Sequence, residues 1–345
     1  MKKLFLFYWP LMSAVIIIFS LIDKIMLLNA SEIPSYAAEN YYKGIPVLVT
    51  GGCGFIGSHL VEKLVSLGAN VSVLDDLSTG DIANIAAVTD KVTFIHGSIT
   101  DFETCLKATN NKKIIFHLAA FVSVPESLKN PKRCHDINIM GTQNILDAAR
   151  INGVNRFVFS STCAVYGESI TPCDENIKPR PASPYGFSKL IGEIYSREYF
   201  FVFGMETVVM RYFNVYGSRQ NPQSSYAGVI TKFTHNMEAN LPITIFGDGT
   251  QTRDYVPVEN IVEANILMGM CNKKLVQGQV FNIATEKSIT IFELIDILKK
   301  QYPNYTGSTL FMPARPGDVK HIAADCSKYK NLCTIMKHYL NTCEE

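Results

Sequence analysis

The sequence lacks any surplus of charge of one sign. It carries 32 Lys and Arg against 31 Asp and Glu, which gives a net charge of +1, and these residues are scattered along the chain. Binding to the phosphate backbone of a nucleic acid requires clustered positive charge. We therefore expect no nucleic-acid partner.

The sequence also lacks the spacings of a metal site. None of its nine cysteines forms a C-x-x-C pair or a Cys/His group at zinc spacing. We expect no metal, and we expect reduced thiols in a reducing compartment. Internal repeats and long linkers are absent too. With 47% hydrophobic and 18% charged residues, the 345-residue chain has the composition of a globular enzyme with one large or two modest domains.

Charge is also missing from the amino terminus. Residues 4–22 form an uncharged stretch that is long enough to span a bilayer. Three interpretations stay open: a membrane anchor or tether, a hydrophobic tail on a cytosolic enzyme, or a start codon placed too early, with Met26 as the true beginning. The reduced cysteines favour a cytoplasmic enzyme, and membrane anchoring is the alternative.

A glycine-rich segment follows a short run of β-branched residues. The run ends at Thr50, and Gly51, Gly54 and Gly57 come directly after it. This pattern predicts a strand, a tight turn and a helix whose amino end faces a pyrophosphate. A second apolar run ends in Asp75-Asp76, 24 residues after Gly51. An acid at this distance binds a free ribose 2′-hydroxyl and repels a 2′-phosphate, so the sequence favours NAD over NADP.

Strand and helix patterns alternate along the first two thirds of the chain. The predicted strands include residues 92–95, 114–120 and 156–160, and a predicted amphipathic helix covers 141–150. Such alternation is typical of an α/β, Rossmann-type doubly wound parallel sheet. After about residue 218 the alternation loosens, which indicates a smaller C-terminal lobe over the carboxyl edge of the sheet.

The predicted domains follow from this pattern. They are an N-terminal hydrophobic segment (1–44), a nucleotide-binding domain (45–217) and a substrate-binding lobe (218–345) that is interleaved with the domain before it.

One tyrosine is placed for acid–base chemistry. Tyr185 has Lys189 four residues later and lies downstream of the hydroxyl-rich segment Ser160-Ser161-Thr162. On a helix the two side chains share a face, so the ammonium would lower the pKa of the phenol towards neutrality. We therefore predict a proton acceptor for redox chemistry on an alcohol. The alternative is a surface Tyr and Lys that stand one helical turn apart by chance.

Residues 45–330 resemble the extended short-chain dehydrogenase/reductases that act on nucleotide sugars, and within them the UDP-hexose 4-epimerases. The motifs that carry this resemblance are Thr50-Gly-Gly-Cys-Gly-Phe-Ile-Gly57, Asp75-Asp-Leu-Ser-Thr-Gly80, Phe116-His-Leu-Ala-Ala120, Ser160-Ser-Thr-Cys-Ala-Val-Tyr-Gly167, Pro184-Tyr-Gly-Phe-Ser-Lys189, Arg211-Tyr-Phe-Asn-Val-Tyr-Gly217, Arg253-Asp-Tyr255 and Arg315-Pro-Gly-Asp318.

The resemblance implies a set of NAD-binding residues: Gly51, Gly54, Phe55, Ile56, Gly57, Asp75, Asp76, Ser98, Ile99, Leu118, Ala119, Ala120, Asn138, Ser160, Tyr185, Lys189 and Phe213. It makes Tyr185 the base, with Lys189 beside it and Thr162 on the sugar hydroxyl. It also implies a UDP-sugar site made of Thr162, Asn214, Val229, Phe246, Arg253, Tyr255, Arg315 and Asp318.

Plain structural roles stay open for several of these residues. Ser160 and Thr162 could cap a strand, Arg253 could pair with Asp254, and the segment from Arg315 could be an ordinary turn.

The resemblance implies NAD-dependent inversion at C4 of a UDP-hexose through a 4-keto intermediate. Related dehydratases and decarboxylases place an acid after the strand-end threonine, where this chain has Cys163-Ala164, so epimerisation is favoured. The alternatives are a UDP-glucuronate 4-epimerase, another nucleotide-sugar-modifying enzyme such as a dehydratase or decarboxylase, and a catalytically inert NAD-binding scaffold. Ile322 aligns with the wall position that tunes acceptance of a 2-acetamido group. Relatives usually form homodimers, here through helices near Thr100–Ala108 and Tyr185–Tyr199.

Overall fold

The computed structural model describes residues 35–221 and 228–342. The predicted apolar stretch 4–22 and Met26 lie outside this range. Within the described residues, no helix combines the length and the hydropathy needed to cross a membrane.

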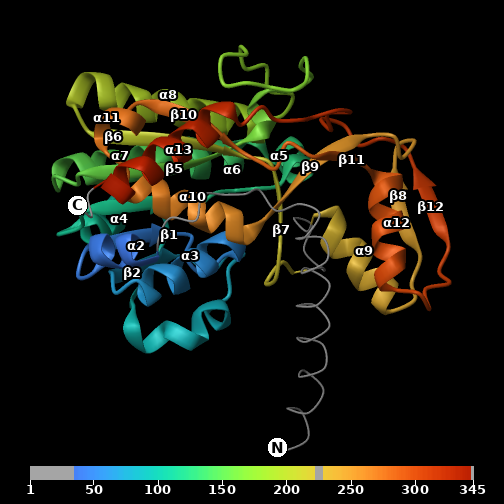
Figure 1. The fold of residues 1–345 in the computed structure, drawn as a ribbon, viewed down its shortest axis with the longest axis horizontal. Helices are drawn as coiled ribbons and strands as arrows, with labels where there is room; N and C mark the ends of the chain where they lie inside the picture. Colours follow the sequence, from blue (N-terminus) through green and yellow to red (C-terminus); the bar gives the residue numbers. More distant parts are fainter. Residues whose placement is uncertain (1–34, 222–227, 343–345) are drawn as a thin grey trace, which may run out of the picture.

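A seven-stranded parallel sheet forms the centre of the molecule (Figure 1). Its strands, in spatial order, are β10 (Gln279–Ile283), β6 (Glu206–Tyr212), β5 (Arg156–Thr162), β4 (Ile114–His117), β1 (Pro46–Thr50), β2 (Asn70–Asp75) and β3 (Thr93–His96). The order reverses between β1 and β4, and ligands of doubly wound sheets bind at the carboxyl end of such a switch point. The predicted fold class is confirmed.

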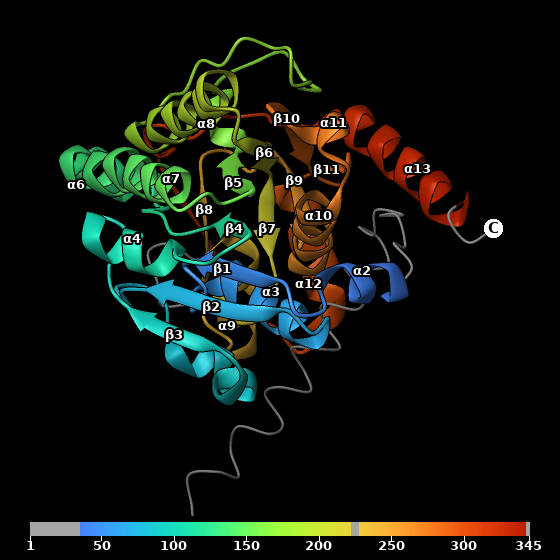
Figure 2. The ribbon, with the colours of Figure 1, turned by 90° about the vertical axis from the view of Figure 1, so that its left-hand side faces the viewer.

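Helices cover both faces of the sheet (Figure 2). One face carries α3 (Phe55–Ser66), α10 (Val258–Met270) and α13 (Ser327–Thr342), and the other carries α4 (Phe102–Thr109), α7 (Gly141–Ile151) and α8 (Pro184–Phe203). Strand β1 shows why both faces are apolar. Val47 and Val49 point into the first core and Leu48 into the second, and all three are fully buried. A strand that is covered on both faces is a continuous hydrophobic run.

A helix also precedes the first strand. α2 (Ser35–Tyr42) packs on α10, where the hydroxyl of the fully buried Tyr42 donates a hydrogen bond to the Ile266 carbonyl at 2.8 Å. The end of the predicted N-terminal segment therefore contacts the core.

A smaller lobe has its own core. It contains α9 (Val229–Glu238), β8 (Ile243–Phe246), α12 (Ile291–Gln301) and β12 (Thr309–Met312), with β8 and β12 paired in parallel (Figure 1). A second sheet, in the order β11 (Ser288–Thr290), β9 (Thr252–Pro257) and β7 (Asn214–Tyr216), connects the two lobes. The remaining short helices are η1 (Ile82–Lys91), α5 (Val124–Lys129), α6 (Pro131–His135), η2 (Asp136–Met140), η3 (Cys163–Val165) and α11 (Lys273–Val276).

The chain crosses between the lobes more than once. α10 and β10 follow the first elements of the smaller lobe in sequence, yet they belong to the seven-stranded sheet and its cover. Elements from both sides of the predicted boundary at residue 217 therefore share one sheet.

Candidate active site

The turn after β1 accepts only glycine. Gly51 has a φ of +69°, and a Cβ there would lie 2.7 Å from the Ala119 nitrogen; a Cβ on Gly57 would overlap the Gly51 carbonyl. Gly54 is the residue before the first turn of α3, which contains Phe55 and Ile56. The amino end of α3 is thus brought against the edge of the sheet, and helix amino ends favour a bound pyrophosphate. These residues fit NAD.

The two aspartates after β2 have different environments. Asp75 is buried, and its two carboxylate oxygens accept hydrogen bonds from the Cys53 and Leu77 nitrogens, both at 2.9 Å. Burial raises the pKa of Asp75, and these hydrogen bonds oppose the rise. Asp76 is exposed. Asp75 therefore ties the glycine turn to β2, and the ribose-binding role of the two carboxylates stays a prediction.

The end of β4 is held by a buried histidine that sequence reasoning did not single out. Thr50 Oγ1 accepts a hydrogen bond from the Ala119 nitrogen at 3.2 Å and lies 2.8 Å from His117 Nδ1. The other ring nitrogen, Nε2, lies 3.1 Å from Thr142 Oγ1. Burial lowers the pKa of His117 to about 3, so the ring is neutral. The sequence signal that could have identified His117 is its position within an apolar segment at the end of a strand.

Asn138 lies on the π-helix η2 and uses both ends of its amide on protein groups. Its Oδ1 accepts from the Phe121 nitrogen at 2.7 Å, and its Nδ2 donates to the Phe121 carbonyl and to Ser188 Oγ, both at 2.9 Å. Asn138 thus fixes the segment after β4 that contains Leu118, Ala119 and Ala120.

Four other predicted cofactor residues contact protein groups. Ser98 Oγ accepts from the Thr100 nitrogen at 3.3 Å, and Ile99 packs in the core beside α7. Ser160 Oγ lies 3.0 Å from the Tyr212 hydroxyl. Phe213 is buried in the cluster that also contains Tyr166.

The predicted catalytic residues come together. Tyr185 stands in the first turn of α8, after the N-cap Ser183, whose Oγ accepts from the Gly186 nitrogen at 3.1 Å. Thr162, the last residue of β5, hydrogen-bonds the Tyr185 phenol. Lys189, one turn further, is 4% exposed, and its Nζ lies 4.9 Å from the centroid of the Phe159 ring. An alcohol and its proton acceptor can meet at this point.

The pKa values do not follow the sequence prediction. Burial raises the pKa of the Tyr185 phenol; the hydrogen bond from Thr162 opposes this, while Cys163 and Cys134 add to it. Burial lowers the pKa of Lys189 to about 8, and Cys134 and Glu193 oppose this effect. The prediction of a lowered phenol pKa in the protein alone is wrong, because the loss of solvation is the largest effect and Lys189 is not among the groups that shift this pKa.

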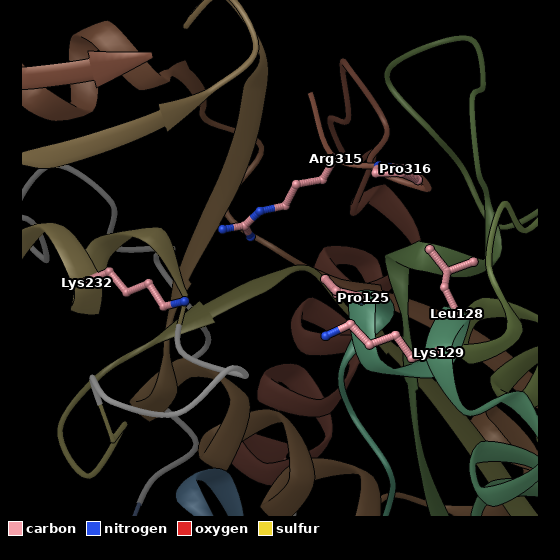
Figure 3. A pocket seen from close by; sticks show the side chains of 6 residues that line it. All are labelled: Pro125, Leu128, Lys129, Lys232, Arg315 and Pro316. Carbon is pink, nitrogen blue, oxygen red and sulfur yellow. The ribbon is translucent and has the colours of Figure 1, made fainter. Parts of the chain in front are cut away.

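A cationic pocket opens between the lobes (Figure 3). It has a volume of about 430 Å³ and is lined by Pro125, Leu128, Lys129, Lys232, Arg315 and Pro316. The Arg315 guanidinium lies over the Phe246 ring, 3.6 Å from its centroid, and α9 supplies Lys232 one turn after Val229. Three cations around one cavity suit a diphosphate. Sequence reasoning missed Lys129 and Lys232, although a lysine in the first turn of α9 was a signal.

The other predicted substrate residues do not line this pocket. Asn214 Nδ2 donates to the Asp254 carbonyl at 3.0 Å. Arg253 donates to the carbonyls of Thr252 and Lys320, at 2.9 and 3.1 Å. The alternative of an Arg253–Asp254 pair is wrong, since Asp254 accepts from Thr285 instead.

Two members of the predicted set differ sharply in exposure. Tyr255 packs in the core of the smaller lobe, and its hydroxyl has no hydrogen-bond partner among the described residues. Asp318 is exposed, and its nitrogen donates to the Arg315 carbonyl at 3.2 Å. Tyr255 therefore does not line this pocket, and its assignment to the uridine nucleotide stays a prediction.

Comparison with known proteins agrees with this geometry. Residues 47–284 match the NAD dependent epimerase/dehydratase family. The chain belongs to this family. Members of this epimerase family that it resembles include a putative UDP-glucose 4-epimerase from Methanocaldococcus jannaschii, which is 40% identical over 83% of this chain and 92% of the relative.

Solved structures of the family have the same fold. A UDP-N-acetylglucosamine 4-epimerase from Methanobrevibacter ruminantium, in complex with UDP-N-acetylmuramic acid, is 36% identical with a TM-score of 0.79, over 84% of this chain and 92% of that one. A UDP-glucose 4-epimerase from Thermus thermophilus, in complex with NAD, is 34% identical with a TM-score of 0.76, over 83% and 92%. The chain is therefore an NAD-dependent enzyme of the extended short-chain dehydrogenase/reductase type.

Proposed function

We propose that this enzyme inverts the C4 configuration of a UDP-hexose. The observation that carries the proposal is the meeting of Thr162, Tyr185 and Lys189 at the carboxyl end of β5, between a glycine turn and a cationic pocket. The nucleotide-sugar epimerases among its relatives support the same reaction.

The residues have distinct tasks in this reaction. The turn from Gly51 to Gly57 would hold NAD, which would supply reversible hydride transfer at C4. Tyr185 in its phenolate form accepts the 4-hydroxyl proton and gives it back, while Thr162 hydrogen-bonds that hydroxyl. The positive charge of a bound NAD nicotinamide would favour that phenolate. Arg315 and Lys232 hold the diphosphate, so the 4-keto sugar can turn and present its other face without leaving.

A dehydratase or decarboxylase would need an acid after Thr162. η3 places Cys163 and Ala164 there, and burial raises the pKa of the Cys163 thiol to about 12. A thiol that stays protonated and a methyl group cannot transfer a second proton, so the proposal is epimerisation.

The size of Ile322, which aligns with a wall position of the sugar site, is the basis for the proposed sugar series. Ile322 is 4% exposed and packs in the cluster that Cys163 contacts. A side chain of this intermediate size suits both glucose and N-acetylglucosamine series. UDP-glucuronate remains the alternative substrate.

A homodimer and a cytoplasmic location are part of the proposal. Phe187, Ile194 and Phe201 are 52–68% exposed and recur every seven residues on α8, which places them on one face. The neighbour of α8 is α7, which in turn packs on α4 (Figure 2). We therefore propose that α8 and α7 contribute to the dimer contact; the predicted segment Thr100–Ala108, which is mostly α4, packs on α7 and stays a prediction.

The test is conversion of UDP-galactose, UDP-N-acetylgalactosamine and UDP-galacturonate by the full chain, with identification of the C4 epimers. Tyr185→Phe should abolish turnover and retain NAD. Tyr195→Phe, on the same helix, is the matched control and should keep activity. Failure of the wild type to epimerise any of the three would favour the inert scaffold, and an active Tyr185→Phe would remove Tyr185 from the mechanism.

A further inference from the structure

Serine hydroxyls form hydrogen bonds with both the N–H and the carbonyl of Tyr185. Ser127 Oγ accepts a hydrogen bond from the Tyr185 nitrogen at 3.2 Å, and Ser188 Oγ donates to the Tyr185 carbonyl at 2.8 Å. Both serines are fully buried. The backbone that carries the phenol is therefore fixed by two side chains that solvent does not reach.

The two serines connect Tyr185 to the segment after β4. Ser127 belongs to α5, where its Oγ also donates to the Val124 carbonyl at 2.7 Å. Ser188 accepts from Asn138 Nδ2 at 2.9 Å, and the same amide pairs with both the nitrogen and the carbonyl of Phe121. A continuous chain of hydrogen bonds thus runs from Phe121 to Tyr185.

The start of α8 explains why this link matters. The first N–H groups of a helix have no partner inside the helix. Pro184 has no N–H, and the Gly186 nitrogen is satisfied by the N-cap Ser183. The Tyr185 nitrogen finds its partner on a different helix, α5. The position of Tyr185 is consequently set by α5 as well as by α8.

We propose that Ser127 and Ser188 are positioning residues. They keep the Tyr185 phenol at a fixed position relative to residues 118–121 and to the cofactor that binds beside these residues. The inference rests on the proposed epimerase function. Neither serine touches the reacting atoms, because their hydroxyls are used on backbone groups and on Asn138. Their effect is on orientation, to which acid–base steps are sensitive.

The test uses the full-length holoenzyme with Ser127→Ala and Ser188→Ala. Each variant should lower kcat for UDP-galactose by about 10-fold and slow reduction of the bound cofactor by sugar to the same extent, seen in the near-ultraviolet absorbance of the reduced nicotinamide. KM, bound NAD and Tm should stay close to wild type. Hydrogen exchange at the Tyr185 amide should become faster in Ser127→Ala.

Ser196→Ala is the matched control. Ser196 is on α8, is fully buried and donates to its own helix at the Gly192 carbonyl at 2.8 Å; its variant should keep kcat. Ser188→Thr, which retains a hydroxyl, should recover most of the loss. The proposal is overturned if both alanine variants keep wild-type kcat, if Ser196→Ala loses as much, or if the loss follows NAD content. An inactive wild type would overturn the function, and unchanged exchange at Tyr185 in Ser127→Ala would independently overturn the positioning role.

Discussion

Arg211 donates two hydrogen bonds to Glu193, from Nε to Oε1 at 2.9 Å and from Nη2 to Oε2 at 2.7 Å. Both side chains are 4% exposed. Ser161 donates to the same carboxylate. Glu193 lies on α8 two turns after Tyr185, and Arg211 lies on β6. The pair therefore anchors the catalytic helix to the sheet below it.

Removing one partner of this buried pair should be costly. Glu193→Gln leaves the Arg211 cation without its counter-charge, and we expect a loss of about 3–5 kcal/mol in the free energy of unfolding, measured by urea denaturation. The double variant Glu193→Met/Arg211→Met should lose less than either single change, because no uncompensated charge remains. Single variants within about 1 kcal/mol of wild type would show that the pair is replaceable.

Lys189 should reduce stability at neutral pH. Its pKa falls from 10.5 in the unfolded chain to about 8 in the fold, so below pH 8 folding must bury a charge. Lys189→Met should therefore raise the free energy of unfolding at pH 7 by about 3 kcal/mol at matched NAD content and abolish turnover.

The pH dependence provides the control for Lys189. Between pH 8 and 10.5 the unfolded chain binds more protons than the folded one, so the stability of the wild type rises with pH and the advantage of Lys189→Met shrinks. Equal stabilisation by Lys189→Met at pH 7 and above pH 10 would contradict a buried ammonium.

His117 should make the fold sensitive to acid. Its pKa is lowered from 6.5 to about 3, so stability is complete above pH 6.5 and falls by up to about 5 kcal/mol as the pH approaches 3. His117→Gln removes this contribution. Urea denaturation should show that the free energy of unfolding falls less between pH 7 and pH 4 in His117→Gln than in the wild type. His338→Gln, in α13, is the control and should behave like the wild type. An identical pH response of His117→Gln and wild type would count against a neutral buried ring.

The apolar stripe of α8 should carry the dimer contact. Phe187→Glu/Ile194→Glu places two charges on it and should shift the protein to monomers in sedimentation experiments. Phe311→Glu, on β12, changes an equally exposed aromatic residue (58% exposed) and should leave the oligomeric state unchanged. A wild type that sediments as a monomer would refute the proposed assembly.

Local sequence patterns were sufficient to predict the nucleotide-binding half. The glycine spacing gave the turn after β1 because Gly51 and Gly57 sit where a Cβ meets backbone atoms. The predicted strand 114–120 is too long, since β4 ends at His117. The Ala119 nitrogen bonds the Thr50 side chain instead of a neighbouring strand, and hydrophobicity does not distinguish these two partners.

Features that depend on distant contacts could not be predicted. The pKa of Tyr185 depends on burial beneath α5 and β5, which the i, i+4 spacing does not report. Lys129 and Lys232 come from helices of different lobes and meet only in the folded pocket. Arg315, which the family resemblance assigns to the diphosphate, lines this pocket, whereas Tyr255, assigned to the uridine nucleotide, packs in the core of the smaller lobe.

The late position of β10 in the chain has a consequence for biosynthesis. This strand, residues 279–283, pairs with β6 along the edge of the central sheet. More than three quarters of these 345 residues must therefore be synthesised before β10 can cover that edge. Until then β6 has unpaired backbone groups with which other nascent chains could pair. Chaperone protection during translation should matter most in that interval.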